Sequence, residues 1–393
     1  MRILWLAPAF LHPTLGGGLI RTLGILRRLS ERHEIHYVAF ADPTQPEGVA
    51  RAGEYSFRAY PFPYPVVERR SNLASLFSRV PENIPTYQSP QLAQCAANLL
   101  KQMRFDRVVV DFLFMAGPCP HPDRSVLLEH NVETIIWRRR LQHARGLTEK
   151  LHLRHQANRM FAYERAACRA AGAVIAVSAH DAGLIRSMFG VERVSDIPTG
   201  VDAEYFAPPA SRPHLADLVF VGLMDWWANA DAVLYFLDRV LPLIRRRRPQ
   251  TTFAIVGRNP PPRILDRARG DSQVLVTGTV PDVRPYLWGA SASVVPMRIG
   301  SGTRIKIYEA MAAGVPVVST TIGAEGLEVK PGQDISIADA PADFAARSVE
   351  LLEDAERRFR MAAAARQLVT ERFSWERVAR SVEQALEGAP AAS

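Results

Sequence analysis

The stretch from Ser293 to Gly326 constrains the fold of this chain most, because it reads as strand, turn, helix and strand in immediate succession. The apolar run Ser293–Val295 stops at Pro296, as a buried strand does. The turn Gly300–Thr303 follows, and glycines let its backbone approach a ligand closely. Val315–Val318 then reads as the next buried strand. This order is typical of an α/β protein with a parallel sheet.

The helix between these strands is predicted from its apolar spacing. Thr303 is expected to cap it and Gly314 to end it. Its expected core face consists of Ile305, Tyr308 and Ala312. Backbone N–H groups, the helix dipole and Lys306 in the first turn converge at its start, which suits a diphosphate. Glu309, one turn later, can accept two sugar hydroxyls, as a ribose site requires.

Lysine is rare in this chain, which gives Lys306 more weight than a lysine usually has. The sequence holds four lysines against 44 arginines, 48 basic residues in all. The alternative for the whole stretch remains an ordinary βαβ unit with a capped helix.

The run KIYEAMAAGVPVVSTTIGAEGL resembles the donor-site signature of retaining glycosyltransferases of family 4. The similarity extends from Ile3 to about Leu386. In that family, the glutamate matching Glu309 binds the nucleotide ribose, and a first glutamate stands eight residues earlier. Here that position is Ser301, so the donor-sugar contact of the first glutamate does not carry over. The GSGTR(I/L)KI variant resembles a subset found in bacterial envelope and exopolysaccharide pathways.

The resemblance implies the GT-B fold: two Rossmann-like α/β domains that face each other across a cleft. We expect an acceptor-binding domain at 1–207 and a nucleotide-sugar donor domain at 208–372. Residues 373–393 are expected to form a helix that packs back on the first domain, then a tail. The proline-rich run Pro208–Pro213 is the expected linker.

A glycine loop, Gly16–Gly17–Gly18, follows the first strand, Arg2–Ala7, and precedes an amphipathic helix. It is not GxGxxG, and no acidic residue ends the second strand, so a Rossmann dinucleotide is not expected. In the resembled family this loop approaches the donor phosphate and the acceptor, which assigns Gly17 and Gly18 to the site. His130 ends the buried strand of SVLLEHNV, where polar groups reach the crevice of an open sheet. The family places a histidine there beside the donor sugar; a helix-capping histidine is the alternative.

The second half supplies the rest of the expected donor site. Many family members carry an Arg and a Lys after the strand that ends here at Gly222, but this sequence has neither. That leaves the diphosphate to Lys306 and Arg304, with the amides of Gly300, Ser301, Gly302 and Thr303. Asn229 is expected to cap the following helix. Val280 and Val283 match the family's loop beside the nucleotide base.

The resemblance implies a retaining hexosyltransferase that uses a nucleotide-diphosphate sugar, and we expect it to be metal-independent. No Asp-x-Asp occurs, so no diphosphate-bridging metal is expected, and no cofactor. The acceptor is expected to be a glycan, a lipid-linked molecule or another small acceptor. The alternatives are a nucleotide-sugar epimerase using Glu129 and Glu133, and a catalytically inactive GT-B binding subunit. A pyridoxal-dependent phosphorylase is a third, without an obvious Schiff-base lysine.

Charge and cysteine content bound the setting. Three scattered cysteines without a CxxC pair suggest a reducing compartment, and no apolar run reaches about 18 residues. We therefore expect a cytoplasmic protein. Residues 1–207 hold 25 Lys+Arg against 19 Asp+Glu, an excess of 25 − 19 = 6. This excess and the basic amphipathic segment Val66–Pro85 suggest peripheral contact with anionic membrane or a lipid-linked acceptor; an arginine-rich proteome is the alternative. No aromatic interleaving supports nucleic acid near Arg245–Arg248.

Overall fold

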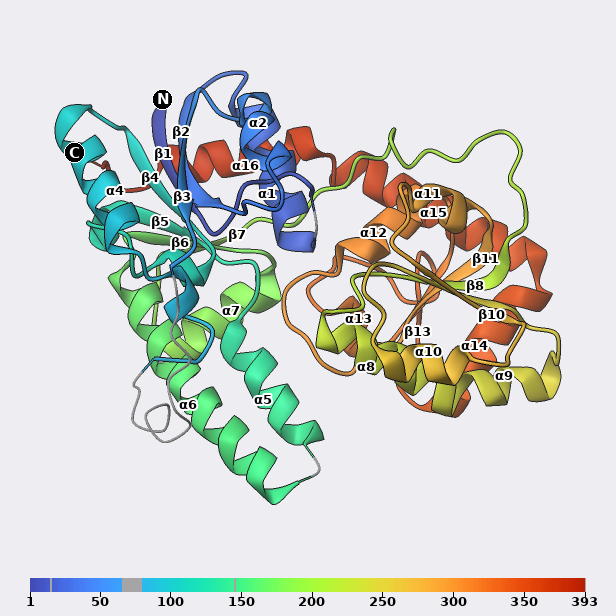
Figure 1. The fold of residues 1–393 in the computed structure, drawn as a ribbon. Coiled ribbons are helices and arrows are strands. Elements are labelled where there is room, and N and C mark those ends of the chain that lie inside the picture. The colour runs from blue at the N-terminus through green and yellow to red at the C-terminus, as the bar shows by residue number, and fades with distance from the viewer. Residues whose placement is uncertain (15, 66–79, 145, 393) are drawn as a thin grey trace. The chain divides into compact units, whose positions relative to one another are not determined.

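The computed structural model of the chain describes residues 1–14, 16–65, 80–144 and 146–392. The chain divides into two compact units (Figure 1). Unit 1 comprises Met1–Pro198 and Val378–Ser393, and unit 2 comprises Thr199–Arg377. The observed boundaries between the units lie at 198/199 and 377/378. The boundaries predicted from the sequence were 207/208 and 372/373. The basic segment Val66–Pro85 lies largely outside the described residues.

The described strands of unit 1 form a seven-stranded parallel sheet in the order β3-β2-β1-β4-β5-β6-β7. The strands are β1 (Arg2–Ala7), β2 (Glu34–Ala41), β3 (Arg58–Pro63), β4 (Arg107–Asp111), β5 (Ser125–Leu128), β6 (Ala173–Ala176) and β7 (Val194–Asp196). The strand order reverses between β1 and β4, so the crevice beyond their carboxyl ends is where a ligand is expected. The central strands are apolar on both faces, as a sheet covered on both sides requires.

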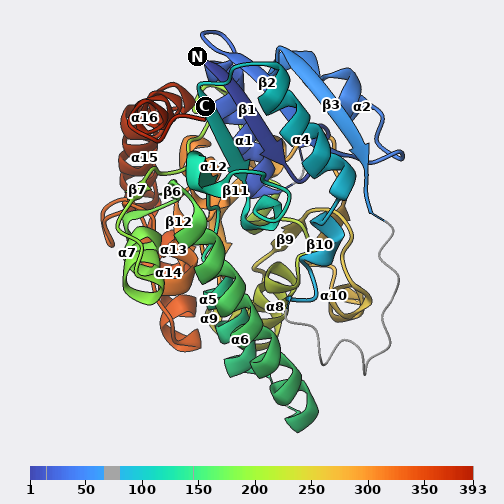
Figure 2. The same cartoon turned by 90° about the vertical axis from the view of Figure 1, so that its left-hand side faces the viewer.

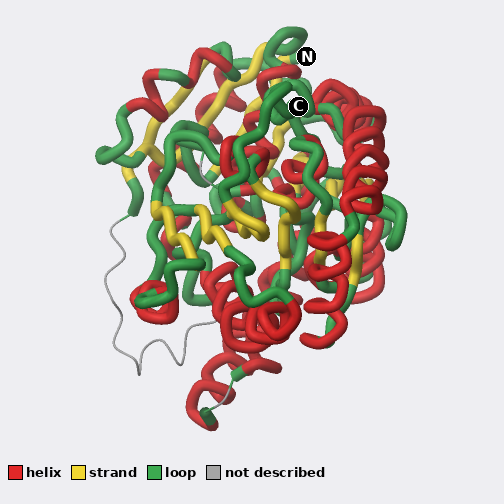
Figure 3. The backbone as a smooth tube through the Cα atoms, turned by 90° about the vertical axis from the view of Figure 1, so that its right-hand side faces the viewer, coloured by secondary structure: helices red, strands yellow, loops and turns green. Residues whose placement is uncertain are grey.

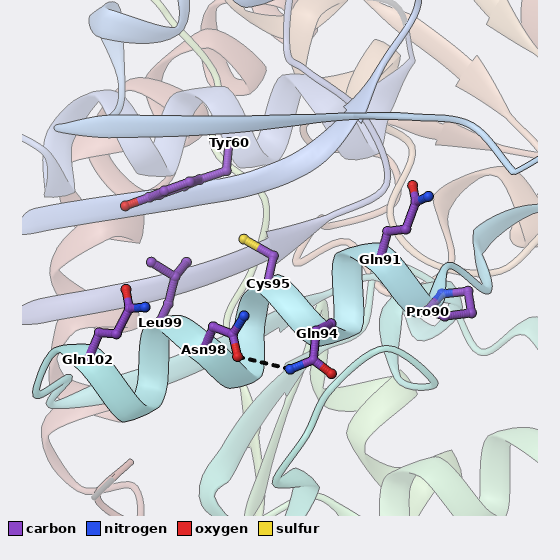
Figure 4. Close-up of a pocket in the computed structure, with 8 residues that line it drawn as sticks. All are labelled: Tyr60, Pro90, Gln91, Gln94, Cys95, Asn98, Leu99 and Gln102. Atoms are coloured by element: carbon purple, nitrogen blue, oxygen red, sulfur yellow. Dashed lines mark hydrogen bonds between the residues drawn. The ribbon is translucent and has the colours of Figure 1, made fainter.

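Helices connect these strands and cover the sheet. They are α1 (Gly17–Leu29), α2 (Glu47–Ala50), α4 (Pro90–Gln102), α5 (Glu133–His143), α6 (Leu147–Ala170) and α7 (Ala179–Phe189). Ser178 caps α7 as its sequence predicts, because its side chain accepts a hydrogen bond from the Asp181 N–H. A surface hollow of ≈ 660 Å³ lies between α4 and Tyr60 of β3 (Figure 4). Two amide side chains that line it bond to each other, since Gln94 donates to Asn98 at 2.9 Å. No predicted site residue lines the hollow.

The long basic stretch after β5 forms two antiparallel helices, α5 and α6, which run side by side in Figures 1 and 2. The buried carboxylate of Glu164 on α6 binds the start of α5. It accepts hydrogen bonds from the backbone N–H of Glu133 at 2.7 Å and of Thr134 at 2.8 Å, and from the Thr134 hydroxyl. These bonds satisfy N–H groups that a helix start leaves without an intrahelical partner.

The described strands of unit 2 form a six-stranded parallel sheet in the order β10-β9-β8-β11-β12-β13. Figure 3 separates the strands of both units from their flanking helices by colour. The strands are β8 (Ala216–Val221), β9 (Phe253–Val256), β10 (Val274–Gly278), β11 (Ala290–Val295), β12 (Val317–Ser319) and β13 (Ser336–Ile337). The order reverses between β8 and β11, and the turn predicted from Gly300–Thr303 follows the second of these strands.

Helices also cover the sheet of unit 2. They are α8 (Trp227–Tyr235), α9 (Leu241–Arg247), α10 (Pro262–Ala268), α11 (Arg284–Trp288), α12 (Ile305–Ala312), α13 (Thr321–Ala324), α14 (Pro341–Glu353) and α15 (Ala355–Arg372). A π-helical turn, Phe236–Val240, joins α8 to α9 just before Pro242, a residue that disfavours a regular helix.

Three local predictions about these helices are wrong. The N-cap of α12 is Arg304, and Thr303 makes no capping bond. Asn229 lies inside α8, whose N-cap is Trp226. The core face of α12 includes Ile307 in place of Ile305, which is partly exposed. For Asn229 a tertiary contact outweighs the local pattern, because its side chain bonds to Leu223 and Lys306.

The last helix, α16 (Trp375–Glu387), returns the chain to unit 1. There Glu383 pairs with Arg32 at 3.0 Å and with His33 at 2.6 Å. The Arg107 side chain donates to the carbonyls of Leu386 and Glu387 at the end of the helix. These bonds satisfy carbonyls that the helix itself leaves without partners.

We predict that Glu164→Ala destabilises unit 1 by roughly 2–4 kcal/mol, because it leaves buried N–H groups at the start of α5 without an acceptor. Chemical denaturation followed by circular dichroism measures the loss. The exposed Glu47→Ala in the same unit is the matched control and should change stability by less than about 0.5 kcal/mol. Equal stability of the two variants would contradict this account of the α5 start.

Candidate functional site

Several predicted site residues follow the carboxyl ends of strands at or next to the strand-order reversal of each sheet, whereas Val280 and Val283 follow the edge strand β10. In unit 2, Gly222 follows β8 and the Gly300–Thr303 turn follows β11. In unit 1, the glycine loop follows β1, and His130 follows β5. Because the carboxyl ends of parallel strands meet at one edge, each set lies in the crevice where such sheets bind ligands.

Lys306 is the central cation of the unit 2 site. Its Nζ donates to Asn229 Oδ1 at 2.8 Å and lies 4.1 Å from the centroid of the Phe220 ring. Both partners are neutral, so the ammonium charge is not paired with a carboxylate. Burial lowers the pKa of Lys306 to about 7; Arg304 lowers it further, and Glu309 opposes the shift. A bound anion would favour the protonated, charged form of Lys306. That charge would in turn strengthen binding of the anion.

Gly222 makes room for this arrangement. A Cβ at residue 222 would lie 2.6 Å from Lys306 Nζ and 2.9 Å from Asn229 Nδ2. No side chain fits there without displacing the ammonium group. The backbone after β8 and the ammonium of α12 therefore meet at one point.

Arg304 supports the turn that precedes α12. Its side chain is buried, and its guanidinium donates to the carbonyls of Ser301 and Gly302 and, at 3.4 Å, of Ile322. A Cβ at residue 300 would lie 2.5 Å from Arg304 Nη2, so the turn closes around the guanidinium. The structure thus gives Arg304 a role within the turn, and its predicted contact with a diphosphate stays a prediction.

Glu309 lies one turn after Lys306, on the same helix. Its carboxylate has no hydrogen bond or ion pair within the described part of the chain. Burial raises the pKa of Glu309 to about 7, and Lys306 opposes this shift. A half-buried carboxylate that receives no hydrogen bond from the described residues can accept hydrogen bonds from the hydroxyl groups of a ligand. Val280 and Val283, the predicted base contacts, pack against the unit 2 core and keep part of their surface accessible.

His130 and Asp111 form the centre of the unit 1 site. His130 Nε2 lies 2.7 Å from Asp111 Oδ1, and both side chains are buried. Asp111 Oδ2 accepts from Trp5 Nε1 at 3.1 Å and from the Thr22 hydroxyl at 2.8 Å. Because a carboxylate only accepts, Nε2 carries the proton and Nδ1 presents its lone pair. Burial lowers the pKa of His130, against the opposing effect of Asp111, so the ring is neutral at pH 7.

The glycine loop borders this histidine. Phe112 stacks on the His130 ring with centroids 3.9 Å apart and has a positive φ of 71°. A Cβ at residue 18 would lie 2.5 Å from the Phe112 ring and 3.6 Å from His130 Cγ. Gly18 is therefore required for the loop to pass the ring, and Gly17 begins α1 beside it. His130 Nδ1 is buried without a hydrogen-bond partner in the described structure. It can accept one hydrogen bond from a hydroxyl of a bound molecule.

Two carboxyl groups near His130 are directed elsewhere. Glu129 is buried and accepts a long contact of 3.6 Å from the Cys168 thiol. Glu133 is also buried, at the start of α5, where Asn131 Nδ2 donates to it at 3.3 Å. Burial raises the pKa of both carboxyl groups, that of Glu133 to about 7. Neither carboxyl group forms a pair with His130.

Two residues that the structure brings into these sites, Asp111 and Asn229, were not among the predicted site residues. Asp111 ends β4 and could have been recognised by the rule applied to His130, since a polar group at the carboxyl end of a strand reaches the crevice. Asn229 was assigned to helix capping, and nothing in the sequence connects it with Lys306. Within the described residues, no cluster of three or more His, Cys, Asp or Glu side chains could hold a metal ion.

Family models match both halves of the chain. A model described as Glycosyltransferase Family 4 matches residues 15–205, and one described as Glycosyl transferases group 1 matches residues 216–354. Each match falls on one of the two sheets described above. The border between them, 205–216, includes the predicted linker.

Curated relatives carry related names. The chain is 31% identical over 207 residues to a glycogen synthase of Mycobacterium tuberculosis, covering 50% of this chain and 48% of that protein. It thus spans about half the length of this relative. It is 28% identical over 305 residues to a GDP-mannose-dependent alpha-(1-6)-phosphatidylinositol monomannoside mannosyltransferase of the same species, covering 68% of this chain and 79% of that protein.

Solved structures share the fold across almost the whole chain. A sucrose-phosphate synthase from Thermosynechococcus elongatus has a TM-score of 0.74 at 17% identity, with 98% of each chain covered. HepE of Anabaena, in complex with UDP and glucose, has a TM-score of 0.71 at 14% identity, covering 98% of this chain and 99% of that one. These similarities confirm the predicted GT-B class of fold, with its two Rossmann-like domains.

We predict that His130→Ala reduces turnover with a nucleotide-sugar donor by on the order of 10²-fold and leaves nucleotide affinity nearly unchanged. The reason is that Nδ1 is the hydrogen-bond acceptor directed beside the glycine loop. Steady-state kinetics and calorimetry with the nucleotide separate the two quantities.

His36→Ala is the matched control, since His36 is also buried in unit 1 and also paired with a carboxylate, Glu34 at 2.8 Å. It should leave the turnover of the folded protein within about threefold of the parent. Unchanged turnover in His130→Ala, or an equal loss in both variants, would return His130 to a structural role.

Proposed function

We propose that the chain is a family 4 glycosyltransferase that transfers a sugar from a nucleotide-diphosphate donor, since its two halves match glycosyltransferase family models. The observation that carries the proposal is the Lys306 ammonium at Gly222, which lies at the strand-order reversal of unit 2 and has no carboxylate partner. A leaving diphosphate needs such a cation, since negative charge develops on it as the glycosidic bond breaks.

The donor site is assigned to unit 2. Lys306 receives the diphosphate, together with backbone amides of Gly300–Thr303, and Glu309 receives the ribose hydroxyls. Val280 and Val283 border the base. Solved neighbours are described as complexes with UDP and with UDP-glucose, and a relative is named for GDP-mannose, which supports a nucleoside diphosphate as the common element.

The sugar and its acceptor are assigned to unit 1. His130 accepts a hydrogen bond from a sugar hydroxyl through Nδ1, and Gly17 and Gly18 let the loop approach the donor phosphate and the acceptor. We propose a retaining, metal-independent transfer, in which Lys306 and the amide dipoles supply the charge that a metal supplies elsewhere. An acceptor that is a glycan or a lipid-linked molecule in envelope or exopolysaccharide synthesis fits the mannosyltransferase relatives.

A nucleotide-sugar epimerase is less well supported by the geometry. It needs carboxyl groups that exchange protons with the sugar, and Glu129 and Glu133 are buried among the helices of unit 1. An inactive binding subunit would keep the Lys306 site and lack transfer. Incubation of donor with and without a membrane lipid extract separates the three: transferred sugar, free epimer or no product.

We predict that Lys306→Ala weakens binding of a nucleoside diphosphate by about 1.5–3 kcal/mol, the range for a hydrogen bond to a charged group. Glu309→Gln keeps the shape of its side chain and loses only the charge-assisted part of its bonds to the ribose. It should therefore cost less, roughly 1–2 kcal/mol. Calorimetry with the diphosphate and with the bare nucleoside measures both effects.

The two ligands serve as each other's control. Lys306→Ala should weaken the diphosphate far more than the nucleoside, whereas Glu309→Gln should weaken both alike. If Lys306→Ala binds the diphosphate as tightly as the parent protein, unit 2 does not bind the donor through α12.

We also propose peripheral contact with anionic membrane, through one face of α6. Leu147 and Leu151 are 76% and 61% exposed, and the exposed cations Lys150 and Arg154 lie on the same helical stripe at i+3 and i+7 from Leu147. Neither cation has an ion-pair partner among the residues the structure describes. A face of exposed leucines and cations suits an anionic lipid surface. No described helix has the length and apolarity needed to span a bilayer.

Sedimentation with vesicles tests this contact. Binding to vesicles with anionic lipid should exceed binding to neutral vesicles and weaken with salt. The double variant Leu147→Gln, Leu151→Gln should reduce it by about threefold or more. The matched control is Leu265→Gln, Leu275→Gln in unit 2, two leucines that are 43% and 47% exposed. Equal binding to both kinds of vesicle would remove the membrane contact and leave the enzyme proposal unaffected.

A further inference from the structure

Asn229 joins the two segments that meet at the unit 2 site. Its Nδ2 donates to the Leu223 carbonyl at 2.8 Å, and its Oδ1 accepts from Lys306 Nζ at 2.8 Å. The side chain is buried. The loop after β8 is thereby connected to α12, across the strand-order reversal.

The chemistry of the two partners fixes the orientation of the Asn229 amide. A carbonyl oxygen only accepts hydrogen bonds, so the amide NH₂ must face Leu223. An ammonium group only donates, so Oδ1 must face Lys306. A flipped amide would lose both bonds. Asn229 is therefore directed to hold a cation at this place.

A lysine needs this kind of support more than most side chains. Its flexible four-carbon stem loses rotamer freedom when it is held in one place. Gly222 provides the space and the Phe220 ring a neutral face, but neither accepts a directed hydrogen bond from Nζ. A carboxylate in place of Asn229 would hold the ammonium more tightly and also neutralise it. A neutral amide holds the group and leaves its charge to the ligand.

We propose that Asn229 is a positioning residue for the transfer reaction, which holds the Lys306 ammonium over Gly222 where the leaving diphosphate binds. This inference rests on the donor site proposed above. It adds a residue from α8 to that site and explains how the site functions without an Arg and a Lys after β8. The amide holds the cation through bonds made within unit 2 alone.

The charged groups around Lys306 make the position of its ammonium measurable. Arg304 and Glu309, both from its own segment, shift the pKa of Lys306 in opposite directions. The elements packed against it, β8 and α8, present the neutral groups Phe220, Gly222 and Asn229. A change at residue 229 should therefore appear directly in the titration of Lys306.

Nuclear magnetic resonance of ¹³Cε-labelled lysine reads this titration without any ligand. The chain has four lysines, so the spectrum is simple, and Lys306→Arg assigns the signal. Asn229→Asp should raise the midpoint of Lys306 by roughly one pH unit, because it adds a negative charge within hydrogen-bond distance. Asn229→Leu should lower it, because it removes the acceptor at similar volume. Gln273→Glu adds the same charge at the opposite ends of the unit 2 strands and should leave the midpoint unchanged.

Calorimetry then relates this position to binding. Asn229→Leu should weaken a nucleoside diphosphate about tenfold at pH 7 and leave the bare nucleoside within about twofold. Affinity for the diphosphate should fall as the pH rises through the midpoint of Lys306, since the neutral amine binds anions poorly. In Asn229→Leu this fall should begin at a lower pH.

Two results overturn the inference. One is an unmoved Lys306 midpoint in both Asn229 variants. The other is an equal loss of diphosphate and nucleoside in Asn229→Leu, which indicates a structural role for Asn229 in α8. Failure of the donor proposal is distinguishable, because Lys306→Ala would then bind the diphosphate normally whatever the titration shows.

Discussion

The constraint on which the unit 2 site depends is a half-buried ammonium group that forms no ion pair with a carboxylate among the described residues. Moving an amine from water into a protein costs free energy, and the cost shows in the lowered pKa of Lys306. The surrounding residues reduce that cost with dipoles and a ring face, from Asn229 and Phe220, without cancelling the charge. The absence of a side chain at Gly222 lets the group reach that place. An anion that binds there recovers part of the cost, which is why the arrangement favours a ligand over internal pairing.

Unit 1 also holds a buried charged group in place with hydrogen bonds, but the group is negatively charged. Asp111 is a fully buried carboxylate, and its oxygens accept from Trp5, Thr22 and His130. Those bonds orient the imidazole and direct its proton inward, so that the lone pair of Nδ1 is presented beside Gly18. The result is a neutral acceptor of hydrogen bonds, in contrast to the cation of unit 2. A neutral group suits a sugar hydroxyl, and a cation suits a diphosphate.

Much of this could be predicted from the sequence, because apolar runs and glycine turns mark strands and their ends locally. The strand before Pro296, the helix that contains Lys306 and the position of His130 all follow from such local patterns. Contacts between distant segments were not accessible. Lys306 and Asn229 lie 77 positions apart, and only the folded sheet brings them together. Asn229 and Thr303 were predicted to be helix caps because asparagine and threonine are both common at that position. Arg304 was assigned to the ligand because the sequence gives residue type and register but not the direction of a side chain.

The direction of Arg304 bears on the substitution at Ser301. In the resembled family a glutamate stands at this position, where its carboxylate faces the donor. Here Ser301 is buried, and its carbonyl accepts from the guanidinium of Arg304, as does that of Gly302. Gly300 leaves the guanidinium the space it occupies. The arginine thus holds the turn from inside through these two carbonyls. These bonds engage the Arg304 guanidinium within the turn, and its predicted contact with a diphosphate stays a prediction beside that of Lys306, the next basic residue of the helix. We therefore interpret the run GSGTRIKI as having two parts: Arg304 holds the loop in shape, and Lys306 is the residue proposed to bind the ligand.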